Sequence, residues 1–197
     1  ILKMSIKISF KKNIAPKYIK NYVLFANEDF KIIGLNKLSL GKDTSFIGKI
    51  IKSTLQKKKE FLTLNLNSYQ KIVLIKKKNN QSALYNEKLG ANFFNYIKSN
   101  SLTDLTFLEN NINNSGSSNK LFLDEFFHGL ELKSYNFNKY KSKTKNETYK
   151  ILVSTTSKNF KLSKDKRFSS LIEGIALTKD LVSEPGNILH PDEYSKR

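Results

Sequence analysis

The feature that most constrains the fold is a short, unbroken apolar run, Ile72–Ile75, between Lys71 and Lys76. Four consecutive apolar residues, mostly β-branched, are typical of a central strand that is covered on both faces. An alternating strand pattern precedes this run over 61–66, and a helix pattern follows it over 83–98. A strand buried on both faces needs cover on both sides of its sheet, so the run indicates an α/β fold.

The rest of the chain alternates between strand and helix patterns. We expect a half-buried first strand at Ile6, Ile8 and Phe10, and we expect the Asn- and Ser-rich stretch 110–119 to be a flexible loop. Two expected strands, 61–66 and 71–76, are adjacent in sequence, so the predicted fold class is an α/β domain with a mixed β-sheet flanked by helices. The other expected elements are strands over 21–26, 105–108 and 149–154 and helices over 44–55, 120–134 and 165–182.

The last of these helices is expected to have an apolar side. That side consists of Phe168, Leu171, Ile172, Ile175 and Val182. These residues recur at helical spacing, as a buried stripe does. Leu181, Val182, Ile188 and Leu189 are expected to lack complete burial without a further domain, because the chain ends soon after a helix that introduces one.

Composition limits the classes of function. With 197 residues, 39% of them hydrophobic, the chain can form one domain of ordinary size and the beginning of another. The chain has no Cys, which excludes a disulfide framework, a thiolate metal site and a cysteine nucleophile. The apolar runs are far shorter than the ~20 residues needed to span a bilayer, and the N-terminus has no signal-peptide core, so we expect a cytoplasmic location and no membrane partner.

A formal net charge of +18 raises the possibility of nucleic-acid binding. Nearly all of this charge is Lys, since Arg167 and Arg197 are the only Arg residues. Dedicated phosphate readers use the planar fork of Arg, and these Lys residues are scattered along the chain. We therefore expect only weak and nonspecific attraction to nucleic acid. A Lys-rich nucleic-acid-binding module stays as the alternative hypothesis, beside a non-catalytic scaffold domain.

Candidate chemistry is sparse. Asp124, Glu125 and His128 form the only local cluster of metal-ligating types, and Asp124 and His128 share a helix face. One helix turn with a single His is a weak ligand set, so we interpret it as a helix edge with one titratable pair. His190 has no companion motif, and the stretch 34–42 has the wrong glycine spacing for a phosphate loop. The aromatic residues of 135–140 could stack bases, but we favour packing over a core. We therefore predict no catalytic, cofactor-binding or metal-binding residue in this sequence.

Three segments, in order, resemble the leucyl (cytosol) aminopeptidase family. The first is Lys71–Ile97, a strand followed by a helix with a Gly90-Ala91 step, and the second is His128–Lys141, HGLELKSYNFNKYK. The third, at 173–191, has Lys179-Asp180-Leu181-Val182, then Pro185, Asn187 and Pro191. The sequence departs from the family pattern at Lys179, where an Arg is usual, and at 76–79, where Lys-Lys-Lys-Asn replaces a Gly-rich turn.

The resemblance implies a macro-domain-like N-terminal α/β domain over 1–158, followed over 159–197 by a linking helix and the truncated start of a catalytic domain. It implies a homo-hexameric exopeptidase that uses two divalent metal ions, Mn or Zn, to release N-terminal amino acids from peptides. The family's metal ligands lie beyond this sequence. We therefore expect no metal bound by this chain and no peptidase activity from it alone.

Overall fold

The computed structural model describes residues 5–32, 35, 44–54, 59–79, 81–114, 121–140, 147–156, 166–186, 188–189 and 191–195. The elements are β1 (Ile6–Lys12), a short 3-10 helix η1 (Pro16–Tyr18), β2 (Asn21–Ala26), α1 (Thr44–Thr54), β3 (Phe61–Asn65), β4 (Lys71–Lys76), α2 (Ala83–Ser99), β5 (Asp104–Leu108), α3 (Glu109–Asn114), α4 (Phe122–Ser134), β6 (Tyr149–Thr155), α5 (Lys166–Ser183) and α6 (Pro191–Tyr194).

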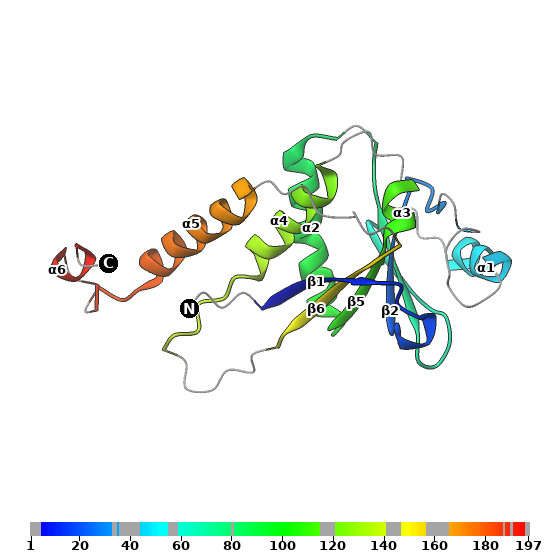
Figure 1. Ribbon diagram of the computed structural model, residues 1–197, viewed down its shortest axis with the longest axis horizontal. Coiled ribbons are helices and arrows are strands. Elements are labelled where there is room, and N and C mark those ends of the chain that lie inside the picture. Colours follow the sequence, from blue (N-terminus) through cyan, green and yellow to red (C-terminus); the bar gives the residue numbers. More distant parts are fainter. Residues whose placement is uncertain are drawn as a thin grey trace.

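The strands form one mixed sheet in the order β1-β6-β5-β2-β4-β3. Figure 1 labels the first four of these strands, β1, β6, β5 and β2. Strands β1, β6, β5, β2 and β4 run parallel, and β3 pairs antiparallel with β4. The antiparallel pair is the pair of adjacent strands expected from the sequence, since a short turn can join only antiparallel neighbours. The predicted fold class, a mixed sheet flanked by helices, is confirmed.

The central strand β4 separates two hydrophobic clusters. Val73 and Ile75 belong to the cluster beneath α2 and α4, whereas Ile72 and Leu74 belong to the cluster beneath α1. All four side chains are at most 1% exposed. The predicted two-sided burial of this run is confirmed, and alternation along β4 explains it, because successive side chains point to opposite faces.

Helices α2 and α4 lie against each other on the first face of the sheet (Figure 1). Their backbones approach closely at two glycines. A Cβ on Gly90 would lie 1.9 Å from the Phe126 carbonyl oxygen, and a Cβ on Gly129 would lie 1.9 Å from the Glu87 carbonyl oxygen. Only glycine leaves room for such an approach. The Gly90-Ala91 step noted in the sequence is therefore a helix-packing site.

One loop prediction is wrong in part. Residues 110–114 belong to helix α3, and 115–119 lie outside the described residues. The reason is tertiary, because Asn111 is 1% exposed and its side-chain amide bonds the backbone of Phe25 on strand β2. Glu109 also places a carboxylate in the first turn of α3, where the helix dipole favours it.

The remaining helices follow the sequence more closely. Ile47 and Ile51 of α1 are buried, as expected for one apolar face, while the Phe46 side chain and Leu55 lie outside the described residues. Helix α4 begins at Phe122, two residues later than expected. In the described part of the chain, no helix combines the length and apolar character that crossing a bilayer would need.

Candidate functional site

The predicted cluster on α4 is buried between helices and does not lie at an exposed helix edge. Asp124, Glu125 and His128 are 7%, 5% and 5% exposed. His128 pairs with Glu87 of α2, with 2.9 Å between Nδ1 and Oε1, and not with Asp124 as the helix spacing had suggested. Glu125 Oε2 accepts a hydrogen bond of 2.7 Å from Asn86 Nδ2, also on α2. The expected helix edge is therefore wrong, because α2 covers this face of α4.

These side chains hold two helices together. The His128 ring lies 5.1 Å from the Phe168 ring of α5, so the same residue touches a third helix. Its Nε2 is buried and has no hydrogen-bond partner among the residues that the structure describes. Across the described ranges, the structure brings no three His, Cys, Asp or Glu side chains into a group that could hold a metal ion. His190 and all of 34–42 except residue 35 lie outside those ranges.

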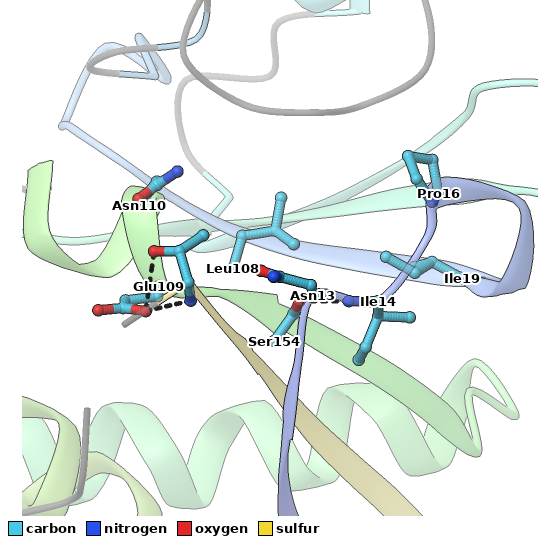
Figure 2. Close-up of a pocket in the computed structure, with 9 residues that line it drawn as sticks. Asn13, Ile14, Pro16, Ile19, Leu108, Glu109, Asn110 and Ser154 are labelled. Carbon is cyan, nitrogen blue, oxygen red and sulfur yellow. Dashed lines mark hydrogen bonds between the residues drawn. The ribbon is translucent and has the colours of Figure 1, made fainter. Parts of the chain in front are cut away.

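A small pocket lies where strands β5 and β6 end (Figure 2). Its volume is about 200 Å³, and its lining includes Asn13, Glu109 and Ser154. The Glu109 carboxylate accepts hydrogen bonds from the backbone N–H and the hydroxyl of Thr156, at 2.5 and 3.1 Å. The carboxyl edge of a parallel sheet is where doubly wound folds bind ligands. Here the carboxylate instead fixes the residue that follows β6.

Strands β2 and β5 pair over only part of their length. The two strands pair only at Tyr22 and Val23 of β2, and beyond that point the Asn111 amide takes the place of a strand. Asn111 Oδ1 accepts from the Phe25 N–H at 2.7 Å, and Asn111 Nδ2 donates to the Phe25 carbonyl at 3.1 Å. The side chain thus satisfies both backbone groups that strand divergence would leave unbonded.

Lys77, the second lysine of the run 76–78, is buried. It is 5% exposed, and its ammonium lies 4.0 Å from the centroid of the Phe122 ring. Burial lowers the pKa of Lys77 to about 8, because an ammonium loses its hydration there. The contact with the aromatic face offsets part of that loss. This lysine therefore connects the residue after β4 to the first residue of α4.

The most extensive polar contacts join the segment after α4 to the end of α5. The Tyr135 hydroxyl donates a 2.5 Å hydrogen bond to Asp180 Oδ1, and Lys179 Nζ donates to the Leu132 carbonyl at 3.0 Å. Lys139 Nζ and the Tyr140 hydroxyl each donate to one carboxylate oxygen of Glu184. We call these residues, 132–140 together with 179–184, the α4–α5 junction.

At the centre of the junction, the buried Glu184 carboxylate accepts hydrogen bonds from a phenol, Tyr140, and from an ammonium group, Lys139. The Glu184 side chain is 2% exposed, whereas that of Lys139 is 49% exposed. The hydrogen bond to Glu184 is the main cause that raises the pKa of both Lys139 and Tyr140. Desolvation, followed by the hydrogen bond to Asp180, raises the pKa of Tyr135 to about 12. Each phenol therefore stays protonated at neutral pH and keeps its hydrogen bond.

The aromatic segment 135–140 had been expected to pack over the core. Tyr135 and Phe137 are half-buried and Tyr140 is 48% exposed, and the phenols bind α5 instead. Neither the spacing nor the residue types within 135–140 indicated that partner, because it lies 44 or 45 residues further along the chain.

The apolar side expected for α5 is only partly buried, since Phe168, Ile172 and Ile175 are half-buried. In the described part of α5 the only buried apolar side chain is Ala176, while Leu171 is 43% and Val182 81% exposed. Leu181, Ile188 and Leu189 are half-buried, which fits the expected incomplete burial at this end. Helix α5 touches α4 through Phe168 and Lys179 and otherwise projects from the domain (Figure 1).

Part of the sequence and most of the fold of this chain are similar to known proteins. No family model matches the chain. A probable cytosol aminopeptidase of Methylorubrum populi is 36% identical over 78 residues, which cover 37% of this chain and 15% of that protein. A mutant of tomato leucine aminopeptidase has the same fold with a TM-score of 0.65 and 17% identity, over 97% of this chain and 41% of that one.

A cytosol aminopeptidase from Coxiella burnetii has a TM-score of 0.58 and 14% identity, over 95% of this chain and 36% of that one. The chain therefore matches well under half the length of each of these three proteins. The three segments that resemble the family lie in contact here, since α2 packs on α4 and the junction joins α4 to α5. In sequence over about a third of its length, and in fold over nearly all of it, this chain is similar to the cytosol or leucine aminopeptidases.

Proposed function

We propose that this chain is the N-terminal α/β part of a cytosol aminopeptidase, and that its role is to hold helix α5 in place for the part of the enzyme that carries out catalysis. The observation that carries this proposal is the α4–α5 junction. It fixes the end of α5 with four hydrogen bonds, two of them to the buried carboxylate of Glu184. A helix held in this way can transmit its orientation to whatever packs against its other side.

The other side of α5 supports such a docking role. Between residues 170 and 181, the positions at helical spacing opposite the α4 contact carry no charge, although 26% of the chain is charged. Leu171 and Leu177 on this side are 43% and 56% exposed. The full set that we call the outer face of α5 is Ser170, Leu171, Gly174, Leu177, Thr178 and Leu181. Contiguous exposed apolar surface of this kind marks a protein interface.

The activity proposed for the complete enzyme is release of N-terminal amino acids from peptides in the cytoplasm by a homo-hexamer. Two divalent metal ions, Mn or Zn, would polarise the scissile carbonyl and supply a hydroxide nucleophile there. The described residues do not fit such a site, so no metal-dependent step is assigned to them. The outer face of α5 would be covered by the catalytic part.

Two measurements test this proposal. The purified chain with added manganese should give no turnover of leucine p-nitroanilide above the buffer rate, and metal-dependent turnover that co-purifies with the chain would refute it. The interface is tested by sedimentation of the chain alone, where the uncovered outer face should cause reversible self-association. Leu177→Lys should suppress it, while Leu84→Lys, at a residue 59% exposed on α2, should not. Equal effects of the two variants would show that the outer face has no special role.

A further inference from the structure

Among the described residues, the hydrophobic cluster on the second face of the sheet covers only one side of that face. The cluster beneath α1 lies over β2, β4 and β3 and reaches β5 only at Leu108. Over β1, β6 and the rest of β5, the structure has a hollow of about 340 Å³. That volume is at the lower end of the range found for small-molecule sites. The hollow is separate from the carboxyl-edge pocket and from the α4–α5 junction.

The strand register arranges the lining of this hollow in two rows. The first row runs across three strands as Lys7, Lys150 and Asp104, and the second as Ser9, Leu152 and Thr106. Neighbouring strands are about 4.8 Å apart, so the Lys7 and Lys150 side chains leave the sheet side by side. Like charges in directly opposed positions are destabilising. A local arrangement that costs stability is often found at a functional site.

The lysines and the Thr106 hydroxyl of the hollow are available to a ligand, whereas the Ser9 hydroxyl donates a 3.4 Å hydrogen bond to the Ile151 carbonyl. Neither Lys7 nor Lys150 makes an ion pair within the described residues, although Asp104 is the neighbour of Lys150 in register. Thr106 is 6% exposed, and its hydroxyl makes no hydrogen bond to the part of the chain that the structure describes. This hydroxyl is not fully buried, so it can exchange a water for a ligand group. The Asp104 carboxylate accepts a 3.3 Å hydrogen bond from the Thr103 hydroxyl, and the Asp104 backbone carbonyl accepts one of 2.7 Å from Asn21 Nδ2.

The rim adds a third cation and an aromatic ring. Lys20 and Tyr18, from the segment that joins β1 to β2, both line the hollow, and Tyr18 is 72% exposed. Lys ammonium groups bind phosphate as point charges. A carboxylate beside them would repel phosphate but accept a hydrogen bond from a hydroxyl of the same ligand. We propose that this hollow binds a small phosphate monoester, with its phosphate at Lys7 and Lys150 and its hydroxyl groups at Asp104 and Thr106.

The experiment titrates the whole chain with AMP at physiological ionic strength, by calorimetry and by amide chemical shifts. Adenosine is the ligand control, because it keeps the ribose and base but lacks the phosphate. Lys150→Met should weaken AMP binding about tenfold or more, since it removes a charged partner. Thr106→Val should weaken it by a smaller factor. Lys98→Met, which removes the same charge from an exposed residue at the end of α2, should leave the affinity unchanged.

The outcomes are distinct. Binding of AMP but not adenosine, with shifts at 104–106 and 150–152 and a loss confined to the hollow variants, supports the proposal. Equal losses in the Lys150 and Lys98 variants would show attraction to the net charge of the chain and overturn it. Absence of binding at millimolar AMP, with thermal melts showing all variants folded, would also overturn it. Tight binding of single-stranded RNA with no response to AMP would assign the surface to a nucleic acid and refute the small-ligand proposal.

Discussion

Replacing Gly90 by Ala tests the closest approach in the structure. The added Cβ would meet the Phe126 carbonyl oxygen at 1.9 Å, so α4 would have to retreat by about 1.5 Å to restore an ordinary contact of 3.4 Å. The obstacle is backbone in the middle of a helix, which cannot rotate away as a side chain can. The same retreat would strain the hydrogen bonds of Glu125 to Asn86 and of His128 to Glu87.

The magnitude combines two opposing effects. Overpacking a tight core costs about 1–3 kcal/mol, and a backbone obstacle places Gly90→Ala at the upper end. The higher helix propensity of Ala opposes this loss and stabilises the folded state by about 1 kcal/mol. We therefore expect the free energy of unfolding to fall by about 2 kcal/mol. Gly174→Ala is the matched control, because it lies inside α5 with no other heavy atom within 4 Å of the added Cβ.

The assay is urea unfolding followed by circular dichroism, on Gly90→Ala, Gly174→Ala and the unmodified chain. The control should gain up to about 1 kcal/mol, so the two variants should differ by about 3 kcal/mol. Helix propensity is common to both substitutions and cancels in that difference. If Gly90→Ala were as stable as Gly174→Ala, the close packing of α2 on α4 would be refuted.

Two further predictions concern polar groups that the fold removes from water, Asn111 fully and Glu131 in part. Asn111→Ala removes both hydrogen bonds to the Phe25 backbone and should lower the free energy of unfolding by about 3 kcal/mol, whereas Asn110→Ala should change it by less than about 1 kcal/mol in the same urea assay; similar small losses in both would contradict the role given to Asn111. Burial raises the pKa of Glu131 from 4.5 to about 7. The native state therefore binds more protons than the unfolded state between these values, and stability should fall as pH rises through that window, by at most about 1.4 kcal/mol per pH unit from this group. Glu131→Gln should remove this slope and the exposed Glu173→Gln should keep it, so a slope unchanged by Glu131→Gln would refute the assignment.

The elements of the sheet could be predicted because their patterns are local. The run at Ile72–Ile75 identified the strand buried on both faces, and the alternation over 61–66 identified its antiparallel neighbour. Segment 110–114 was missed because nothing near Asn111 in sequence reveals a partner 86 residues away on β2. Its helix depends on that long-range contact more than on the low helix propensity of Asn.

The candidate site was less predictable than the fold. Helix spacing suggested that His128 would face Asp124, but α2 supplies Glu87, 41 residues away, as the partner. The sequence also showed an apolar stripe on α5 without showing whether a core or a partner would cover it. Periodicity records which residues share a face, and it carries no information about which element faces them.

By itself, the sequence determined the positions of the strands, the helices of the α/β class and the resemblance of three segments to one family. The tertiary structure decided that those segments touch each other, that Tyr135 and Tyr140 bind the end of α5 and the residue after it, and that Lys7 and Lys150 lie side by side on neighbouring strands of the sheet. The physical reason is the separation along the chain of the residues that interact. Strand and helix patterns arise from burial over a few neighbouring residues, whereas pairing order and helix docking depend on contacts between residues that are distant in the chain.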